Sequence, residues 1–110
     1  MVRHPSRRSA PLIIVTGNYR VPPEQRDRFM GSKQDQVART RQESGCLEYA
    51  YSADAHEPGL VRLIEHWESM DDLQAHLRGF RADPPPEPDV EVASTTFAVF
   101  EATPTSFPRG

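Results

Sequence analysis

The sequence predicts an α+β domain with one antiparallel sheet and the element order β-α-β-β-α-β. Three observations support this prediction. Apolar segments of strand length stand near both ends of the chain, two more flank a polar loop in its middle, and the intervening segments have the composition of surface helices. This order is the ferredoxin-like pattern, in which both helices lie on one face of the sheet.

The first half of the chain is predicted to form a strand and then a helix. Residues 12–19 start with an apolar, β-branched run, which is typical of a strand buried on both faces. Pro22 and Pro23 then stand where the first turn of a helix tolerates proline. We expect this helix to run to residue 43 or 44 and Gly45 to end it in a left-handed turn. Its narrow buried stripe is expected to consist of Phe29, Met30, Val37 and Ala38.

A hairpin is predicted in the middle of the chain. Residues 47–53 and 60–67 have strand-like composition, and the segment between them, residues 54–59, contains proline and glycine. A short loop of this kind joins antiparallel neighbours. We therefore expect these two strands to pair directly.

The last third of the chain is predicted to form a helix and a final strand. Ser69 is followed three residues later by Asp72, which is a capping-box arrangement, so a helix should begin there and end near residue 79. The proline-rich residues 83–88 must be extended. Residues 90–101 alternate well enough to form the last strand.

Length and composition limit the classes of protein to consider. A chain of 110 residues forms one domain, which we place at residues 12–102 between disordered tails at residues 1–11 and 103–110. No apolar run approaches the ~20 residues of a membrane span. A net charge of −3 with scattered arginines gives no footprint for nucleic acid. The single cysteine and the absence of a secretory signal indicate a cytoplasmic protein.

His76 is the strongest candidate for chemistry. Leu73, His76, Leu77 and Phe80 follow the i, i+3, i+4, i+7 spacing of one helix face, so the imidazole should point toward the sheet. An inward imidazole that faces a cavity suits general acid–base catalysis. One that is satisfied by a backbone carbonyl is only a structural polar group, and the residues leave both interpretations open.

Several strand residues are weaker candidates. Glu65 and Trp67 share one sheet face, and so do Tyr49 and Tyr51, while Asn18 near the end of the first strand offers an amide to a ligand oxygen. Each of these residues also has a structural interpretation, because aromatic side chains on strands are usually core residues and an asparagine can simply turn the chain.

We expect neither a metal nor a cofactor. Cys46 follows Gly45 and is interpreted as a small buried hydrophobe, since no second cysteine or activating partner adjoins it. The spacing of the four histidines does not indicate a metal site.

Three short motifs in this chain resemble the antibiotic biosynthesis monooxygenase family. They are Gly45-Cys46-x-x-Tyr49, Glu65-x-Trp67-x-Ser69 and Ala75-His76, and the resemblance extends over residues 12–101. It implies a dimeric α+β barrel, a homodimer in which the sheet of a second subunit covers the sheet face that the helices leave open.

The resemblance also implies a reaction. Members of this family oxidise electron-rich phenols, anthrones or hydroquinones with molecular oxygen and without flavin or metal. Catalytic roles would then fall to His76 as proton acceptor or orienting group, Asn18 as polar handle and Trp67, together with Tyr51, as an aromatic wall. The remaining pocket residues would be Tyr49, Tyr51, Glu65, Leu73 and Phe80.

Two other uses of the same pocket remain open at this point. One is a non-catalytic dimer that binds a small ligand, and the other is an isomerase that exchanges protons without consuming oxygen.

Haem degradation, found in another branch of the family, is disfavoured. That branch uses an asparagine, a tryptophan in the second helix and a histidine further along. Here His76 stands near the tryptophan's place and residues 77–88 contain no histidine. The chain also departs from the polyketide-tailoring branch, because no asparagine stands shortly before Trp67.

Overall fold

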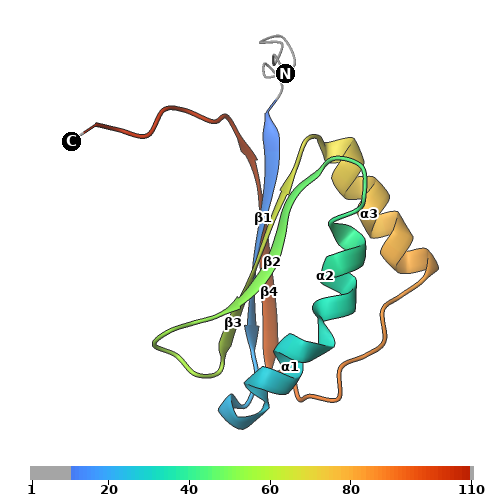
Figure 1. The fold of residues 1–110 in the computed structure, drawn as a ribbon, viewed down its shortest axis with the longest axis vertical. Coiled ribbons are helices and arrows are strands. Elements are labelled where there is room, and N and C mark those ends of the chain that lie inside the picture. Colours follow the sequence, from blue (N-terminus) through green and yellow to red (C-terminus); the bar gives the residue numbers. More distant parts are fainter. Residues whose placement is uncertain (1–10, 110) are drawn as a thin grey trace.

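The computed structural model describes residues 11–109 and shows a four-stranded antiparallel sheet with helices on one of its faces (Figure 1). The order of the strands across the sheet is β2-β3-β1-β4. The predicted α+β ferredoxin-like fold is therefore confirmed. The elements are β1 (Leu12–Arg20), the 3-10 helix η2 (Pro23–Gln25), α1 (Arg26–Ser32), α2 (Gln34–Thr40), β2 (Cys46–Ala53), β3 (Leu60–Trp67), α3 (Met70–Ala82) and β4 (Ser94–Ala102).

Strand β1 lies at the centre of the sheet and shows how its two faces differ. Val15 pairs with Glu65 of β3 and with Val99 of β4, and all three side chains point to the helix side. Ile14 and Ile64, one residue along each strand, point to the open side and are half-buried. The expectation that the first strand is buried on both faces is thus wrong for the single chain, because every helix lies on the same side.

The first helical region is broken rather than continuous, which corrects the prediction of one helix to residue 43 or 44. The break is at Lys33 between α1 and α2, and α2 ends at Thr40. The Ser32 hydroxyl donates to the Phe29 carbonyl at 2.7 Å, and the Lys33 amide donates to the Met30 carbonyl at 3.2 Å. Such a three-residue turn tightens and interrupts the helical ladder.

Gly45 makes the predicted left-handed turn before β2. Its φ is 80°, and an added Cβ would clash with the side chain of Asp72. Its carbonyl accepts a hydrogen bond of 2.9 Å from the Glu68 amide. Only glycine fits this combination of backbone conformation and close approach, so the turn is held against the start of α3.

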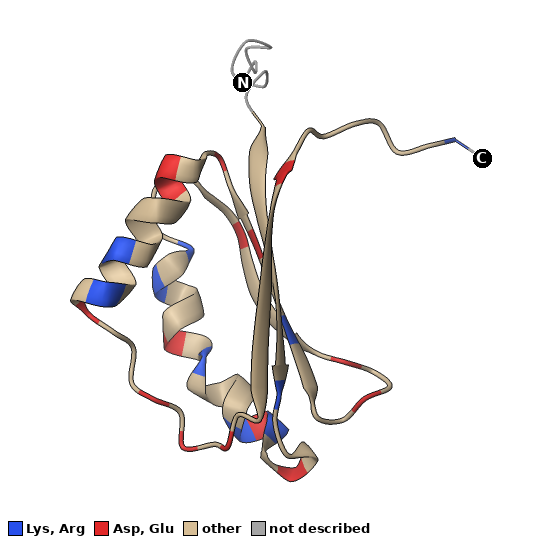
Figure 2. Ribbon diagram, turned by 180° about the vertical axis from the view of Figure 1, so that it is seen from behind, with Lys and Arg blue, Asp and Glu red and all other residues tan. Residues whose placement is uncertain are grey.

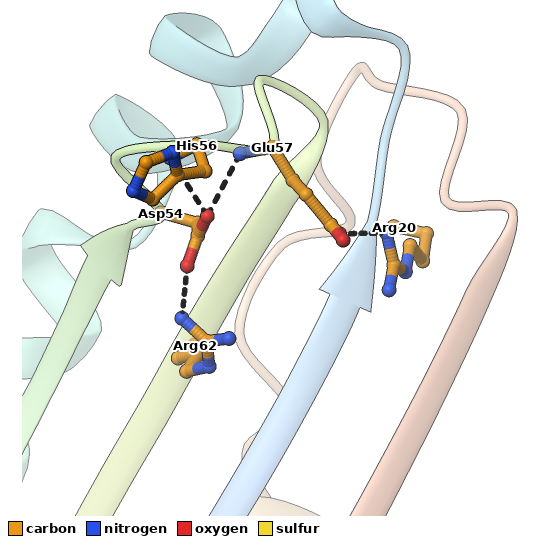
Figure 3. Close-up of polar contacts among 5 residues, drawn as sticks. All are labelled: Arg20, Asp54, His56, Glu57 and Arg62. Carbon is orange, nitrogen blue, oxygen red and sulfur yellow. Dashed lines mark hydrogen bonds and ion pairs between the residues drawn. The ribbon is translucent and has the colours of Figure 1, made fainter.

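The hairpin loop between β2 and β3 is stabilised by one carboxylate (Figure 3). Asp54 accepts hydrogen bonds from the backbone amides of His56 at 2.9 Å and Glu57 at 2.7 Å, and it also pairs with Arg62. Arg20 of β1 pairs with Glu57 at 2.6 Å. These contacts fix the turn that the sequence predicted.

Helix α3 begins at its predicted cap and ends later than predicted. Ser69 accepts a hydrogen bond of 3.2 Å from the Asp72 amide. Acidic residues stand in the first turn and Arg81 in the last, as the helix dipole favours (Figure 2). The helix continues to Ala82 instead of residue 79. Pro84 disfavours a helical conformation in the residue before it, and the helix stops there.

Strand β4 starts at Ser94, four residues later than the predicted position 90. The preceding segment is tied to the first helical region instead of the sheet, since the Gln25 side chain accepts from the Glu91 amide at 2.9 Å. Arg28 also donates to the Asp89 carbonyl at 3.2 Å. The alternation of apolar and polar residues that predicted the strand does not show these side-chain contacts.

Both ends of the chain lie outside the sheet and helices. Residues 103–109 form no helix or strand and project from the end of β4 (Figure 1). The predicted N-terminal tail falls, apart from Pro11, outside the described residues. Within residues 11–109, no helix is long and apolar enough to cross a membrane.

Candidate functional site

A mostly apolar cavity of about 370 Å³ lies between the helices and the helix side of the sheet. A cavity of this size is near the lower end of the range for small-molecule sites. Six of the eight predicted site residues line it, namely His76, Tyr49, Tyr51, Glu65, Leu73 and Phe80. The other lining residues are Val15, Tyr19, Gln36, Leu63, Leu77, Phe97 and Val99.

His76 of α3 is buried, and one of its ring nitrogens is occupied. Nδ1 lies 2.7 Å from Oε1 of Glu43, and only 4% of His76 is exposed. A carboxylate can only accept, so Nδ1 donates to Glu43, and in the neutral imidazole the unprotonated nitrogen is then Nε2. His76 also lines the cavity. The structure thus brings together a histidine and a carboxylate in the arrangement of a general base.

Glu43 is not among the residues that were predicted for the site. It lies in the connection between α2 and β2, two residues before Gly45, and is only half-buried. The turn at Gly45 holds this connection against the start of α3, which is the helix that carries His76. A glutamate in a polar connection carries no periodic signal, so only the packing of the turn identifies it.

Aromatic rings enclose the His76 imidazole. The ring centroids lie at 4.4 Å for Phe80, 4.8 Å for Trp67 and 5.6 Å for Tyr49. Trp67 is fully buried and its indole N–H donates to Glu65 Oε1 at 2.8 Å. The prediction that Trp67 forms a wall of the pocket is therefore not met. Its ring packs beside His76, and its only donor is already used.

Glu65 is a buried carboxyl group on the cavity wall. Burial raises the pKa of Glu65 above its ordinary value, while the hydrogen bond from Trp67 and the nearby His76 partly oppose this effect. The residue is 6% exposed. The neutral, protonated form is therefore favoured more than in a solvent-exposed glutamate.

The phenol groups of Tyr49 and Tyr51, on the same sheet face as Glu65, are linked by one amide. Gln36 Nε2 lies 2.7 Å from the Tyr49 hydroxyl and 3.0 Å from the Tyr51 hydroxyl. Burial raises the pKa of Tyr49 to about 12 and also raises the pKa values of Tyr51 and Tyr19. All three phenols are therefore neutral near pH 7. Gln36 is a second residue that the sequence analysis missed. Gln36 and Thr40 are both buried and stand four residues apart, so this spacing on one helix face was the available signal.

Asn18 does not belong to this site. Its amide lies on the open sheet face and donates to the Thr96 hydroxyl at 3.5 Å. Its neighbours in the chain, Gly17 and Tyr19, are the residues that point to the helix side. The prediction of Asn18 as a polar handle in the pocket is therefore wrong. Side chains alternate between the two sheet faces along β1, and Asn18 falls on the face away from the cavity.

The cavity offers oxygen, imidazole and aromatic groups but no thiolate. Burial raises the pKa of Cys46, which disfavours its reactive form. Among residues 11–109, no group of three or more His, Cys, Asp or Glu side chains could hold a metal ion.

Comparison with solved structures shows which proteins share this fold. A conserved protein from Methanosarcina mazei superposes with a TM-score of 0.71 at 23% identity, covering 86% of this chain and 96% of that one. A proposed antibiotic biosynthesis monooxygenase from Deinococcus radiodurans gives 0.70 at 21% identity, covering 89% and 99%. The heme-degrader MhuD from Mycobacterium tuberculosis gives 0.69 at 13% identity, covering 86% and 99%. At these identities the similarity shows the fold alone.

Sequence comparison provides the family. An uncharacterised protein of Synechocystis sp. is 29% identical over 66 residues, which are 60% of this chain. The chain matches only 45% of the length of that relative. The family model for antibiotic biosynthesis monooxygenases matches residues 12–81. Since this match includes well over half of the sequence, the chain belongs to the antibiotic biosynthesis monooxygenase family.

Proposed function

We propose that this protein is a cofactor-independent monooxygenase that oxidises a small phenolic, quinol or polycyclic aromatic compound with molecular oxygen. The observation that carries the proposal is the His76–Glu43 pair, in which a buried imidazole paired with a carboxylate lines an apolar cavity of about 370 Å³. The mostly apolar walls suit a planar aromatic compound, and the few polar groups converge on one region.

The first step is removal of the phenolic proton. His76 Nε2 accepts it, and the Glu43 carboxylate stabilises the imidazolium that results. Burial raises the pKa of Glu65, which lessens the repulsion between this carboxyl group and the new phenolate. The phenolate is a far better electron donor than the phenol, so it can reduce oxygen directly.

The second step joins oxygen to the ring. One electron passes from the phenolate to oxygen, and the two radicals recombine into a peroxide before they separate. Overall, a phenol with a free ring C–H and one oxygen molecule give a quinone and one water. One oxygen atom of O₂ enters the quinone, and the other forms water with the hydrogens from the phenol O–H and the ring C–H. Apolar walls such as Val15, Leu63 and Leu73 exclude the bulk water that would intercept these intermediates.

We also propose that the active form is a homodimer. On the open sheet face, Ile14 and Ile64 are only half-buried and Phe100 is 51% exposed. A second copy that packs its own open face against this one would bury these side chains. This arrangement would complete the dimeric α+β barrel expected from the sequence.

Oxygen uptake by metal-free protein tests the proposal. A panel of hydroquinones, dihydroxynaphthalenes and anthrones would be compared with an autoxidation control without protein. We expect uptake that depends on the protein and falls about 10²- to 10⁴-fold in His76→Ala, as for loss of a general base. The matched control is His56→Ala, which removes an exposed imidazole from the hairpin loop and should leave uptake unchanged.

The alternatives predict different results from the same experiment. Uptake no faster than autoxidation, together with ligand affinity that is insensitive to His76→Ala, would favour a non-catalytic binding dimer. Solvent-proton exchange into the ligand without oxygen consumption would favour an isomerase. In either case the monooxygenase proposal would be abandoned.

A further inference from the structure

Three tyrosines form a continuous row along the cavity. Tyr19 comes from β1, and Tyr51 and Tyr49 come from β2. The ring centroids are 5.7 Å apart for Tyr19 and Tyr51 and 6.0 Å apart for Tyr51 and Tyr49. All three line the same cavity, so we call them the tyrosine row.

The hydrogen-bond capacity of the tyrosine row leaves one hydroxyl hydrogen without an acceptor inside the row. The Gln36 amide nitrogen donates one hydrogen to each of the Tyr49 and Tyr51 oxygens and can accept none in return. A row of three hydroxyls has only two links between neighbours, so those links use at most two of the three hydroxyl hydrogens. At least one O–H is therefore available to a ligand in the cavity.

The available O–H belongs at the Tyr49 end of the row. Tyr49 stands at the end of the row, where its oxygen accepts from Gln36 and has only Tyr51 as a neighbour within the row. The Tyr49 ring is also the one that lies 5.6 Å from the His76 ring. A hydrogen donated by Tyr49 and a proton accepted by His76 can thus meet at one ligand atom.

We propose that Tyr49, supported by Tyr51 and positioned by Gln36, is an oxyanion-binding group that holds the ionised phenol oxygen of the substrate beside His76. This inference rests on the proposed function only for the identity of the oxygen that is held. Hydrogen bonds to an ionised oxygen are about twice as strong as neutral ones, and an apolar cavity strengthens them further.

The acidity of the groups fits this division of roles. Burial raises the pKa of Tyr49 to about 12, above the value of about 10 for an ordinary phenol. When a substrate phenol and Tyr49 compete for one proton, Tyr49 keeps its hydrogen and the substrate loses its own to His76. Tyr49 thereby remains a donor throughout the reaction.

The test measures which form of a phenol the protein binds. 4-Nitro-1-naphthol is a suitable probe because its ionised and neutral forms absorb at different wavelengths, and its methyl ether cannot ionise. Titration of the full-length protein should show preferential binding of the ionised probe. Tyr49→Phe should weaken binding of the ionised probe about 10- to 100-fold, as expected for a lost hydrogen bond to a charged group. Binding of the methyl ether should change little.

A pair of glutamine variants separates positioning from general effects on α2. Gln36→Met should reduce the preference for the ionised probe, because it removes the amide that orients both phenols. Gln34→Met is the matched control, since Gln34 is exposed and its amide donates to the Met30 carbonyl. The control should bind both probes as the unmodified protein does. Tyr51→Phe provides a second reading if Tyr49→Phe fails to fold.

Several outcomes would overturn the inference. Failure of the unmodified protein to bind the ionised probe, or equal affinity for both forms, would show that the tyrosine row is only packing. An unchanged preference in folded Tyr49→Phe would lead to the same conclusion. Oxygen uptake without a preference for the phenolate would remove this inference and leave the monooxygenase. A preference without uptake would leave the oxyanion site and remove the monooxygenase.

Discussion

The two faces of the sheet use the same strands yet have opposite character. On the helix side, Trp67 is fully buried, and Glu65 is 6% exposed and lines the cavity together with His76. On the open side, Asn18 and Arg62 are exposed and paired with each other across β1 and β3. Burial raises the pKa of Glu65 on the helix side, whereas hydrogen bonds from Arg62 and two backbone amides hold the pKa of Asp54 in the hairpin loop below its usual range. The two faces therefore modify their polar groups by different physical causes.

Strand β4 is the exception to this division. Phe97 and Val99 point to the helix side and line the cavity, but they are 57% and 51% exposed. Phe100 on the other face is 51% exposed. Residues 94–101 of β4 are all exposed, so the helices leave this strand uncovered. The cavity is accordingly shielded from solvent where β2 and β3 line it and open to solvent where β4 lines it.

The largest test of the comparison is a pair of phenylalanine truncations. Phe29→Ala removes a fully buried ring and should cost about 3–5 kcal/mol in the free energy of unfolding. Phe100→Ala should cost below about 1 kcal/mol if the open face is free in solution. Urea unfolding measures both. A cost for Phe100→Ala that approaches the cost for Phe29→Ala and grows with protein concentration would show that a second copy covers this face.

A charge at the centre of the open face tests the dimer directly. Ile64→Glu places a carboxylate from each copy in the proposed interface, and we expect the dimer dissociation constant to rise about 100-fold or more. Sedimentation at micromolar concentration should show a dimer before the change and a monomer after it. Ala75→Glu, on the exposed side of α3, is the control. A monomer in the unmodified protein would remove the proposed dimer.

Two glycines distinguish the constrained turn from an ordinary helix position. Gly45→Ala should destabilise the fold by about 1–3 kcal/mol, because φ is 80° and the new Cβ would meet Asp72. Gly31→Ala should stabilise it by about 0.5–1 kcal/mol, since nothing lies within 4 Å of the new Cβ. Thermal and urea unfolding measure both. Equal effects would show that the Gly45 turn does not constrain the connection that carries Glu43.

The smallest effect is a pH dependence from Glu65. Burial raises its pKa in the folded chain, so the folded chain binds a proton at pH values where the unfolded chain has released it. The corresponding stability is complete below the ordinary pKa of 4.5 and is lost as pH rises through the raised value. Glu65→Gln keeps an acceptor for Trp67 and should remove this pH dependence of the unfolding free energy. The dependence corresponds to at most one bound proton. Parallel stability curves from pH 4 to 7 would contradict the assignment.

Local patterns correctly predicted much of the fold and part of the site. The capping box at Ser69, the hairpin loop and Gly45 all act within a few residues, so the sequence shows them directly. The inward direction of His76 follows from helical spacing in the same way. The break at Lys33 was missed because a serine side chain that competes for a carbonyl gives no periodic signal.

The sequence by itself determined the order of the elements, the side of α3 that faces the sheet and the family of the chain. Only the tertiary structure decided that Glu43 holds His76, that Gln36 joins Tyr49 to Tyr51, and that Asn18 faces away. The first two contacts join side chains 33 and 13 residues apart. Such pairs depend on how separate helices and strands pack against one another. A local pattern depends only on the period of one helix or strand.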